Sequence, residues 1–326
     1  MSLDTSVATT TDQRHARLNR IELVERAGPF LLLVALCVAG AFLSPAFLHS
    51  TNVTNVLRSA TPLAVVAAGQ TLVILIGGID VSVGALVAAT TVTGGTIMSG
   101  SDSKILPTIL ILLLLGLIVG LVHTVLTVKM GTDPFVTTLG TMLVLQGGTL
   151  LYSNGSPQNR VTPLFRGLTQ HEVFRIPMIV PLVALLYIVL AVALKRTTWG
   201  DRLYAVGGNR SAARLSGVRV DRVQASAWIL CSMLTVVGGV ILLAFTGSGA
   251  PTDGSDLALN SIASVLIGGT AFGGGRGGIA GTAAGVLILT VLFNIFNLLA
   301  ITTFAQPIIE GVVVIVGIAL YSRRRH

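Results

Sequence analysis

The stretch LPTILILLLLGLIVGLVHTVLTV, from Leu106 to Val128, contains no Asp, Glu, Lys or Arg. A membrane-spanning helix needs about 20 consecutive, mostly apolar residues, and this stretch is long enough. Ile279–Ile301 is free of these charges as well. Charged residues make up 10% of the whole chain, against about 25% in soluble domains. The sequence therefore predicts an all-α, polytopic membrane protein.

Ten apolar stretches fit membrane-spanning helices, the third and eighth being the least apolar because they are rich in Thr, Ser and Gly. The ten stretches lie at 28–48, 60–77, 82–99, 106–128, 134–152, 176–194, 223–246, 257–273, 278–300 and 305–321. This division leaves a polar N-terminal tail at 1–27, a transmembrane domain at 28–321 and a basic C-terminus at 322–326. The tail is too long and polar for a signal peptide, so we expect the first apolar stretch to be retained as a helix.

The basic residues predict the orientation. With both termini in the cytoplasm, the inner segments carry 16 Lys or Arg residues and the outer segments carry 5, as the positive-inside rule requires. The formal net charge of +8 therefore reflects membrane topology and does not indicate nucleic acid. The two cysteines, Cys37 and Cys231, both fall inside apolar stretches, so we expect neither a disulfide nor a metal site.

The segment IGGIDVSVGALVAAT, Ile76–Thr90, places an acid inside an apolar region. Gly77 and Gly78 weaken the preceding helix, and Asp80 and Ser82 are candidate N-caps for the next one. Two interpretations stay open: Asp80 only caps, or the break borders a permeation path or a moving joint. They are compatible, because irregular backbone survives at membrane depth where it lines a cavity or is buried in protein.

Small residues fill two of the expected helices, Val83–Thr96 and the helix that opens with GIAGTAAGV at Gly278–Val286. Such residues allow helices to approach closely, and a smooth path for a polar solute is the alternative. A faint internal echo relates VILIGG at Val73–Gly78 to SVLIGG at Ser264–Gly269. It indicates either a structural repeat or chance in a glycine-rich chain.

Neutral polar groups and one acid also fall within the apolar stretches. A path for a hydroxyl-rich solute needs such groups, whereas each one singly could form an interhelical hydrogen bond. We expect His123 to be structural and Glu310 to face an unidentified counter-charge. The residues are Gln70, His123, Gln146, Asn260, Asn294, Asn297 and Glu310.

The inner loop Lys195–Arg222 is predicted to contain a short docking helix, Arg210–Ser216. Asn209 can cap its start, and Gly217 can end it in the left-handed conformation. Ala212 and Ala213 leave room for close docking, and Arg210 and Arg214 share a face that could meet acids on a partner. A solvated, positively charged loop is the alternative. The outer loop 153–175 is expected to be irregular or to form a short re-entrant element.

Enzyme motifs are absent from the sequence. GGGRGG at Gly273–Gly278 lies between two apolar stretches and not in a βαβ unit, so it is no nucleotide fingerprint. The chain has no phosphate-binding G-x-x-x-x-G-K-[ST] motif and no paired acids within its spans. We expect no enzyme, no catalytic residue and no cofactor in this chain.

GQTLVILIGGIDVSVGALVA, Gly69–Ala88, resembles the Gly-Gly-Ile-Asp signature of ribose-type ABC importer permeases. Three further stretches agree in order and spacing: Pro134–Met142, Tyr204–Val218 and Ile262–Ile288. The likeness extends from about residue 30 to 321, and the branched-chain amino-acid permeases, which lack the signature, are more distant. The chain departs from the common pattern at ALNSIA, Ala258–Ala263, where two acids are absent, and at Glu310, where Lys is common.

This resemblance implies a multi-pass permease subunit of a bacterial inner membrane. A second permease, identical or a sister chain, would complete the path for a sugar or sugar-like solute. Cytoplasmic ATPase subunits would hydrolyse ATP, and a periplasmic or extracellular binding protein would deliver the solute. The alternative is a stand-alone channel or secondary carrier, in which the basic inner loop has no obvious role. An intramembrane enzyme is a third, weaker hypothesis.

Overall fold

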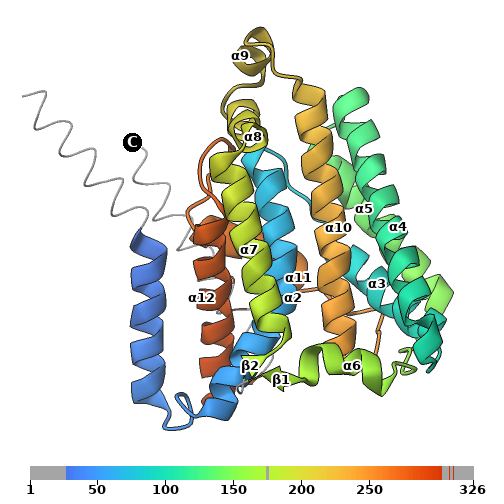
Figure 1. The fold of residues 1–326 in the computed structure, drawn as a ribbon, viewed down its shortest axis with the longest axis vertical. Coiled ribbons are helices and arrows are strands. Elements are labelled where there is room, and N and C mark those ends of the chain that lie inside the picture. The colour runs from blue at the N-terminus through green and yellow to red at the C-terminus, as the bar shows by residue number, and fades with distance from the viewer. Residues whose placement is uncertain (1–26, 174–175, 303–307, 309–310, 312–326) are drawn as a thin grey trace, which may run out of the picture.

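The computed structural model describes residues 27–173, 176–302, 308 and 311, and its helices run between two ends of one bundle (Figure 1). The long elements are a first helix at Ala27–Leu43, α2 at Ser50–Leu75, α3 at Val83–Met98, α4 at Ile105–Thr124, α5 at Pro134–Ser153, α7 at Ile179–Arg196, α10 at Val220–Thr246, α11 at Leu257–Ile267 and α12 at Ile279–Leu298. The short elements are the 3₁₀ turn Asp102–Lys104, the π turn Val125–Lys129, α6 at Pro163–Gln170, α8 at Thr198–Gly208, α9 at Arg210–Leu215, and the antiparallel strands β1 at Glu172–Val173 and β2 at Ile176–Pro177.

Six of the described helices are long and apolar enough to cross a membrane. They are α2, α4 with its flanking turns, α5, α7, α10 and α12. The first helix, α3 and α11 match three more of the predicted stretches but are shorter than a full span. Apart from residues 308 and 311, the tenth stretch, 305–321, lies outside the described residues, as do most of the two terminal segments. The all-helical prediction holds apart from the two-residue strands, while the total of ten spans stays a prediction.

The glycine pair of the signature ends α2 as predicted. Gly77 adopts a φ of 77°, its N–H donates to the carbonyl of Ile74, and the N–H of Gly78 donates to the carbonyl of Val73, both at 2.9 Å. This is a Schellman motif, in which a left-handed residue just past the helix allows the last carbonyls to be satisfied.

The second Leu-Ile-Gly-Gly segment ends α11 with the same geometry. Gly269 has a φ of 86°, and the N–H groups of Gly269 and Thr270 donate to the carbonyls of Leu266 and Val265 at 2.9 and 3.1 Å. The left-handed residue is the second glycine here and the first glycine in α2, so the two breaks differ by one position. The internal echo thus corresponds to a shared way of ending a helix.

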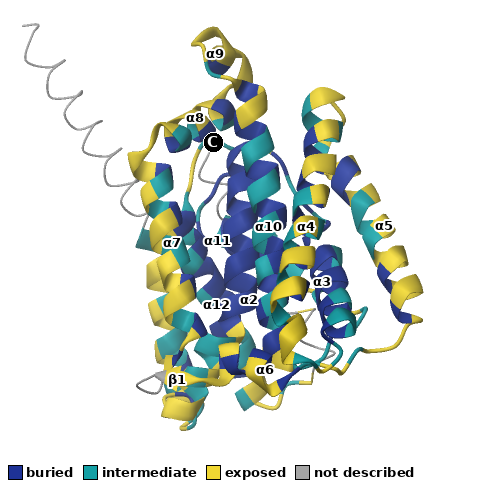
Figure 2. Cartoon of the chain, turned by 45° about the vertical axis from the view of Figure 1, so that its right-hand side comes forward, coloured by how far each residue is buried: buried dark blue, intermediate teal, exposed yellow. Residues whose placement is uncertain are grey.

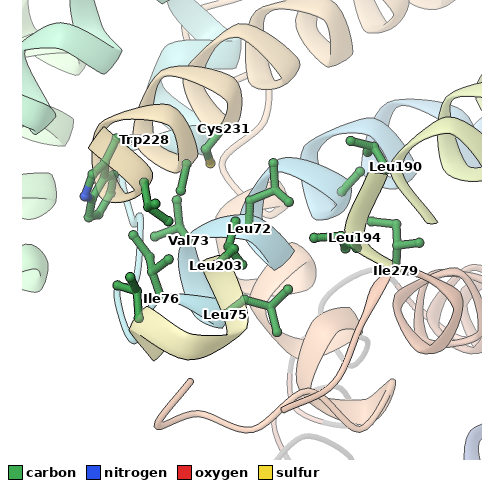
Figure 3. Close-up of a cluster of buried hydrophobic side chains, with 14 of the residues drawn as sticks. Leu72, Val73, Leu75, Ile76, Leu190, Leu194, Leu203, Trp228, Cys231 and Ile279 are labelled. Atoms are coloured by element: carbon green, nitrogen blue, oxygen red, sulfur yellow. The ribbon is translucent and has the colours of Figure 1, made fainter. Parts of the chain in front are cut away.

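Helix α2 forms the centre of the bundle. In its most apolar window 83% of residues are buried, against 28% for α4 with its flanking turns and 17% for α5. The burial colours show the same contrast between α2 and the outer faces of α5 and α7 (Figure 2). Around the end of α2, Leu72 and Ile76 pack with Trp228 of α10 and Leu203 of α8 (Figure 3).

The small residues serve close packing, which confirms the first of the two interpretations. An added Cβ at Gly285 of α12 would collide with the carbonyl oxygen of Ser264 in α11. One at Gly281 would collide with that of Gly268, and one at Gly94 of α3 would approach Leu243 to 2.6 Å. At these positions the glycines therefore allow α12 to lie directly against the backbone of α11, and α3 to lie against Leu243 of α10.

The segment 153–175, predicted as an outer loop, contains a short helix, α6, which lies across one end of the bundle (Figure 1). Thr162 caps it by accepting a hydrogen bond from the N–H of Phe165 at 3.2 Å. Nearby, Arg58 of α2 forms an ion pair with Glu172 at 2.8 Å. The loop is thus partly helical, with α8 and α9 at the opposite end of the bundle (Figure 1).

Candidate functional site

The Asp80 carboxylate organises the joint between α2 and α3. Its Oδ1 accepts hydrogen bonds from the backbone N–H of Ser82 at 2.9 Å and from the Ser82 hydroxyl at 2.6 Å. Ser82 is the N-cap residue immediately before α3, and it makes no side-chain capping bond. Of the two predicted N-caps, Ser82 thus takes the N-cap position. Asp80 does not cap α3, because it closes a local Asx turn ahead of the helix and accepts from the Ser82 hydroxyl.

Two neutral side chains hold the backbone of this joint. Gln70 is fully buried in α2, and with its amide oriented by the hydrogen-bond network it donates to the carbonyl of Asp80 at 3.3 Å and accepts from its N–H at 3.2 Å. Thr138 of α5 accepts from the N–H of Val81 and contacts the carbonyl of Ile79, both at 3.2 Å. The break is thus fixed from two sides.

The second carboxylate oxygen of Asp80 faces two other helices. Its Oδ2 lies 3.6 Å from Nδ1 of His123 in α4 and 4.0 Å from Sγ of Cys231 in α10. His123 in turn packs edge-to-face on Trp228, with 5.4 Å between ring centroids. Sequence reasoning missed this contact, because the residues are far apart in the chain and no local pattern joins them.

Gln146 and Asn260 do not join this group. Gln146 is exposed on the outer face of α5, and Asn260 is buried in α11 with no hydrogen bond to its Oδ1 from the described residues. Asn294 forms a reciprocal amide pair with Asn52, at 3.0 and 2.8 Å, so for this residue the interhelical hydrogen bond is the correct interpretation. Glu310 lies outside the described residues.

The short helix predicted at Arg210–Ser216 is present as α9, Arg210–Leu215, while its docking role stays a prediction. Asn209 caps it, accepting from the N–H of Ala212 at 2.9 Å. Gly217 follows with a φ of 80° and donates to the carbonyl of Arg214 at 3.1 Å, while Val218 donates to that of Ala213 at 3.0 Å. The local signals in the sequence therefore gave both ends of this helix correctly.

The faces of α9 differ from the prediction. Ala213 is 4% exposed and packs into this chain's own core, whereas Ala212 is exposed. Arg210 turns inward and donates to the carbonyl of Ile76 at 3.2 Å, and Arg214 pairs with Asp221 at 3.1 Å. The two arginines thus have partners within this chain.

A cavity of about 330 Å³ connects the α2 break to α9. Ile76 and Gly78 line it beside Arg210 and Trp228, and the turn that leads into α5 forms the other wall. In that turn Asp133 caps α5, accepting from two backbone N–H groups at 2.9 and 3.1 Å. The cavity is lined mainly by polar groups and backbone, and the sequence gave no direct signal for it.

Three segments converge at the end of α2. The N–H of Gly275, in the glycine-rich loop, donates to the carbonyl of Leu75 at 2.9 Å. Tyr204 of α8 donates to the carbonyl of Gly277 at 2.9 Å, and burial raises the pKa of this Tyr204 phenol. An added Cβ at Gly207 would collide with the carbonyl of Leu75. The end of α2, α8 and the glycine-rich loop are therefore in direct contact.

A bundle of apolar helices, with a broken helix that borders a polar cavity, defines a multi-pass membrane protein of the transporter class. The chain belongs to the family described as branched-chain amino acid transport system / permease component, which matches residues 52–319.

Curated relatives agree with this assignment over nearly the whole chain. A ribose import permease of Bacillus subtilis strain 168 is 37% identical, covering 96% of this chain and 99% of the relative. One from Escherichia coli K12 is 35% identical, covering 93% and 95%. The galactose/methyl galactoside import permease of E. coli K12 is 29% identical, covering 93% and 96%. No solved structure matches the chain.

Proposed function

We propose that this chain is the membrane-embedded permease subunit of an ATP-binding-cassette importer for a sugar or sugar-like solute. The observation that carries the proposal is the similarity to ribose and galactose import permeases along almost the whole chain. The break at Gly77–Asp80, with Gln70 and Ser82 beside it, borders a polar cavity as a transport element would. ATP hydrolysis would take place in a separate subunit.

Reconstitution tests this function against a stand-alone channel or carrier. The purified chain is placed in liposomes with its ATPase and its binding protein, and uptake of radiolabelled ribose and galactose is measured. We expect uptake of one of these sugars only when ATP and the binding protein are both present. Uptake by the chain alone, without ATP, would instead show a channel or carrier.

The ATPase would dock on α9, at the end of the bundle opposite to α6. Leu215 supports this position, because an apolar side chain 91% exposed at the tip of the molecule is suited to a partner's groove. The Arg210 contact with the carbonyl of Ile76 links this helix to the α2 break. Motion of a docked ATPase would thus pass from α9 to the α2–α3 joint through the contact of Arg210 with Ile76. The binding protein would meet the α6 end.

A second permease would cover the outer face of α5. The exposed positions of this helix include Gly140, Gly147 and Gly148, each with open space where a Cβ would lie, and the exposed amide of Gln146. Large apolar residues are exposed on α4, α5 and α7 alike, and among these three helices α5 adds exposed glycines and an amide to them. Small residues and amides at membrane depth favour helix–helix contact, so α5 is the face best suited to another copy or a sister chain.

A further inference from the structure

The two oxygens of the Asp80 carboxylate have unequal surroundings. Oδ1 accepts both hydrogen bonds from Ser82, whereas Oδ2 faces the imidazole of His123 at 3.6 Å and the thiol of Cys231 at 4.0 Å. The side chain is 1% exposed, so bulk water does not solvate the second oxygen. A buried carboxylate with an uncompensated charge is costly, and a thiol is a weak donor.

His123 presents the complementary problem. Its side chain is 0% exposed, and neither ring nitrogen has a hydrogen-bond partner within the described part of the chain. A neutral imidazole would bury one unsatisfied donor and one unsatisfied acceptor. A protonated imidazole buries two donors: Nε2 has no partner within the described part of the chain, but Nδ1 then carries positive charge toward the Asp80 carboxylate, 3.6 Å away.

We propose that His123 is protonated in the folded protein and is the counter-ion of Asp80, and that the pair positions the α2–α3 joint against α4. Either charge alone would be buried without compensation, whereas together they are neutral. His123 is thus a positioning residue, which acts on transport through Asp80.

The remaining neighbours of the pair leave no other counter-charge among the described residues. Cys231 from α10 is the other titratable group at the carboxylate. Gln70 from α2 and Thr138 from α5 are neutral and bind the backbone of the joint. Arg210 is engaged with the carbonyl of Ile76. Among the described residues, His123 is therefore the one group placed to balance the charge of Asp80.

A charge-removal cycle tests the proposal by uptake in liposomes and by thermal unfolding of the same preparations. His123→Asn leaves the carboxylate without a counter-ion, and we expect uptake to fall by about tenfold or more. Adding Asp80→Asn removes the second charge, and uptake should return to within about threefold of the wild type, since residues in contact are not additive. Thr108→Val, at a buried site elsewhere on α4, is the control and should leave uptake unchanged. Asp80→Asn is also measured alone. If uptake in the double variant falls by the product of the two single-variant losses, the two residues act independently and the proposal is contradicted.

A spectroscopic measurement on an intact His123–Asp80 pair decides the matter even if the charge variants do not assemble. His15, His49, His171 and His326 are replaced by Gln, so that His123 is the one histidine left. The protein is labelled with ¹⁵N-histidine and studied in lipid by solid-state NMR at neutral pH. We expect the signals of an imidazolium or of an Nδ1 proton shared with the carboxylate. The spectrum of an ordinary neutral imidazole would overturn the proposal.

Discussion

At the scale of single residues, Gly207 lies where α8 touches the end of α2. A Cβ at this position would collide with the carbonyl oxygen of Leu75 and approach the N of Gly275 to 2.6 Å. These two atoms already share a hydrogen bond of 2.9 Å, so neither can move freely. Gly208, the next residue, has nothing within 4 Å of its Cβ position.

This difference predicts opposite outcomes for two neighbouring substitutions. Gly207→Ala should destabilise the junction by about 1–3 kcal/mol, the usual cost of forcing atoms into a packed region. Gly208→Ala should be neutral or slightly stabilising, because Ala is the better helix former. Thermal unfolding of the purified subunit measures both. Equal effects of the two changes would contradict the close contact.

Residues whose roles depend only on residues next to them in the sequence could be predicted. Gly77 and Gly217 were assigned as helix ends, and Asn209 as a cap, because left-handed backbone and capping bonds are formed within a few residues. The contact of His123 with Asp80 spans 43 positions and follows from how α4 packs on the joint. The burial of Ala213 has the same origin, since two adjacent alanines in a short helix do not reveal which of them its own chain covers.

At the scale of elements, α9 presents Leu215 as its exposed apolar residue, while its arginines are bound within the chain. The change that tests docking is therefore Leu215→Glu and not a substitution of the buried Ala213. We expect Leu215→Glu to lower ATPase binding by about tenfold or more, because a buried, unpaired charge at an interface is costly.

Leu164→Glu provides the matched control for this test. Leu164 is an exposed leucine of α6, at the opposite end of the bundle. Its replacement should leave ATPase binding unchanged, as judged by co-purification and by surface plasmon resonance. Binding that is unaffected by Leu215→Glu would place the docking surface elsewhere.

Elements were predictable where hydropathy alone defines them, and less so at their ends. α11 ends at Ile267 and not near 273, because its turn is made by Gly268 and Gly269 inside the apolar stretch. α2 begins at Ser50, ten residues before the apolar stretch, since its polar first turns remain helical. Hydropathy reports contact with lipid or core, whereas helix ends are set by backbone hydrogen bonds.

At the scale of the whole molecule, α6 and α9 occupy opposite ends, which predicts their accessibility (Figure 1). Ser156→Cys, in the loop before α6, and Ser211→Cys, in α9, both place a thiol at an exposed position. In a background with Cys37 and Cys231 replaced by Ala, an impermeant thiol reagent on intact cells should label only Ser156→Cys. Labelling of Ser211→Cys from outside would reverse the orientation.

The proposed partner face of α5 makes a prediction for the assembled importer. In the same background, Gly147→Cys should form a disulfide between two copies under mild oxidation, because facing cysteines cross-link when their Cα atoms are about 4.4–6.8 Å apart. Val189→Cys, exposed on the apolar face of α7, is the matched control and should stay monomeric on non-reducing gels. A cross-link at Val189 and none at Gly147 would favour α7 as the contact.

The amide pair of Asn52 and Asn294 has a consequence for biogenesis. Its two members are separated by 242 positions, and α2 packs against α10, α11 and α12, all of which are synthesised after it. During translation α2 therefore enters the membrane long before the surfaces that will cover it exist. Lipid or an insertase must accommodate the amides and small residues of α2 until α12 emerges from the ribosome. Helix α12, which is made late, thus packs against α2, which is made early.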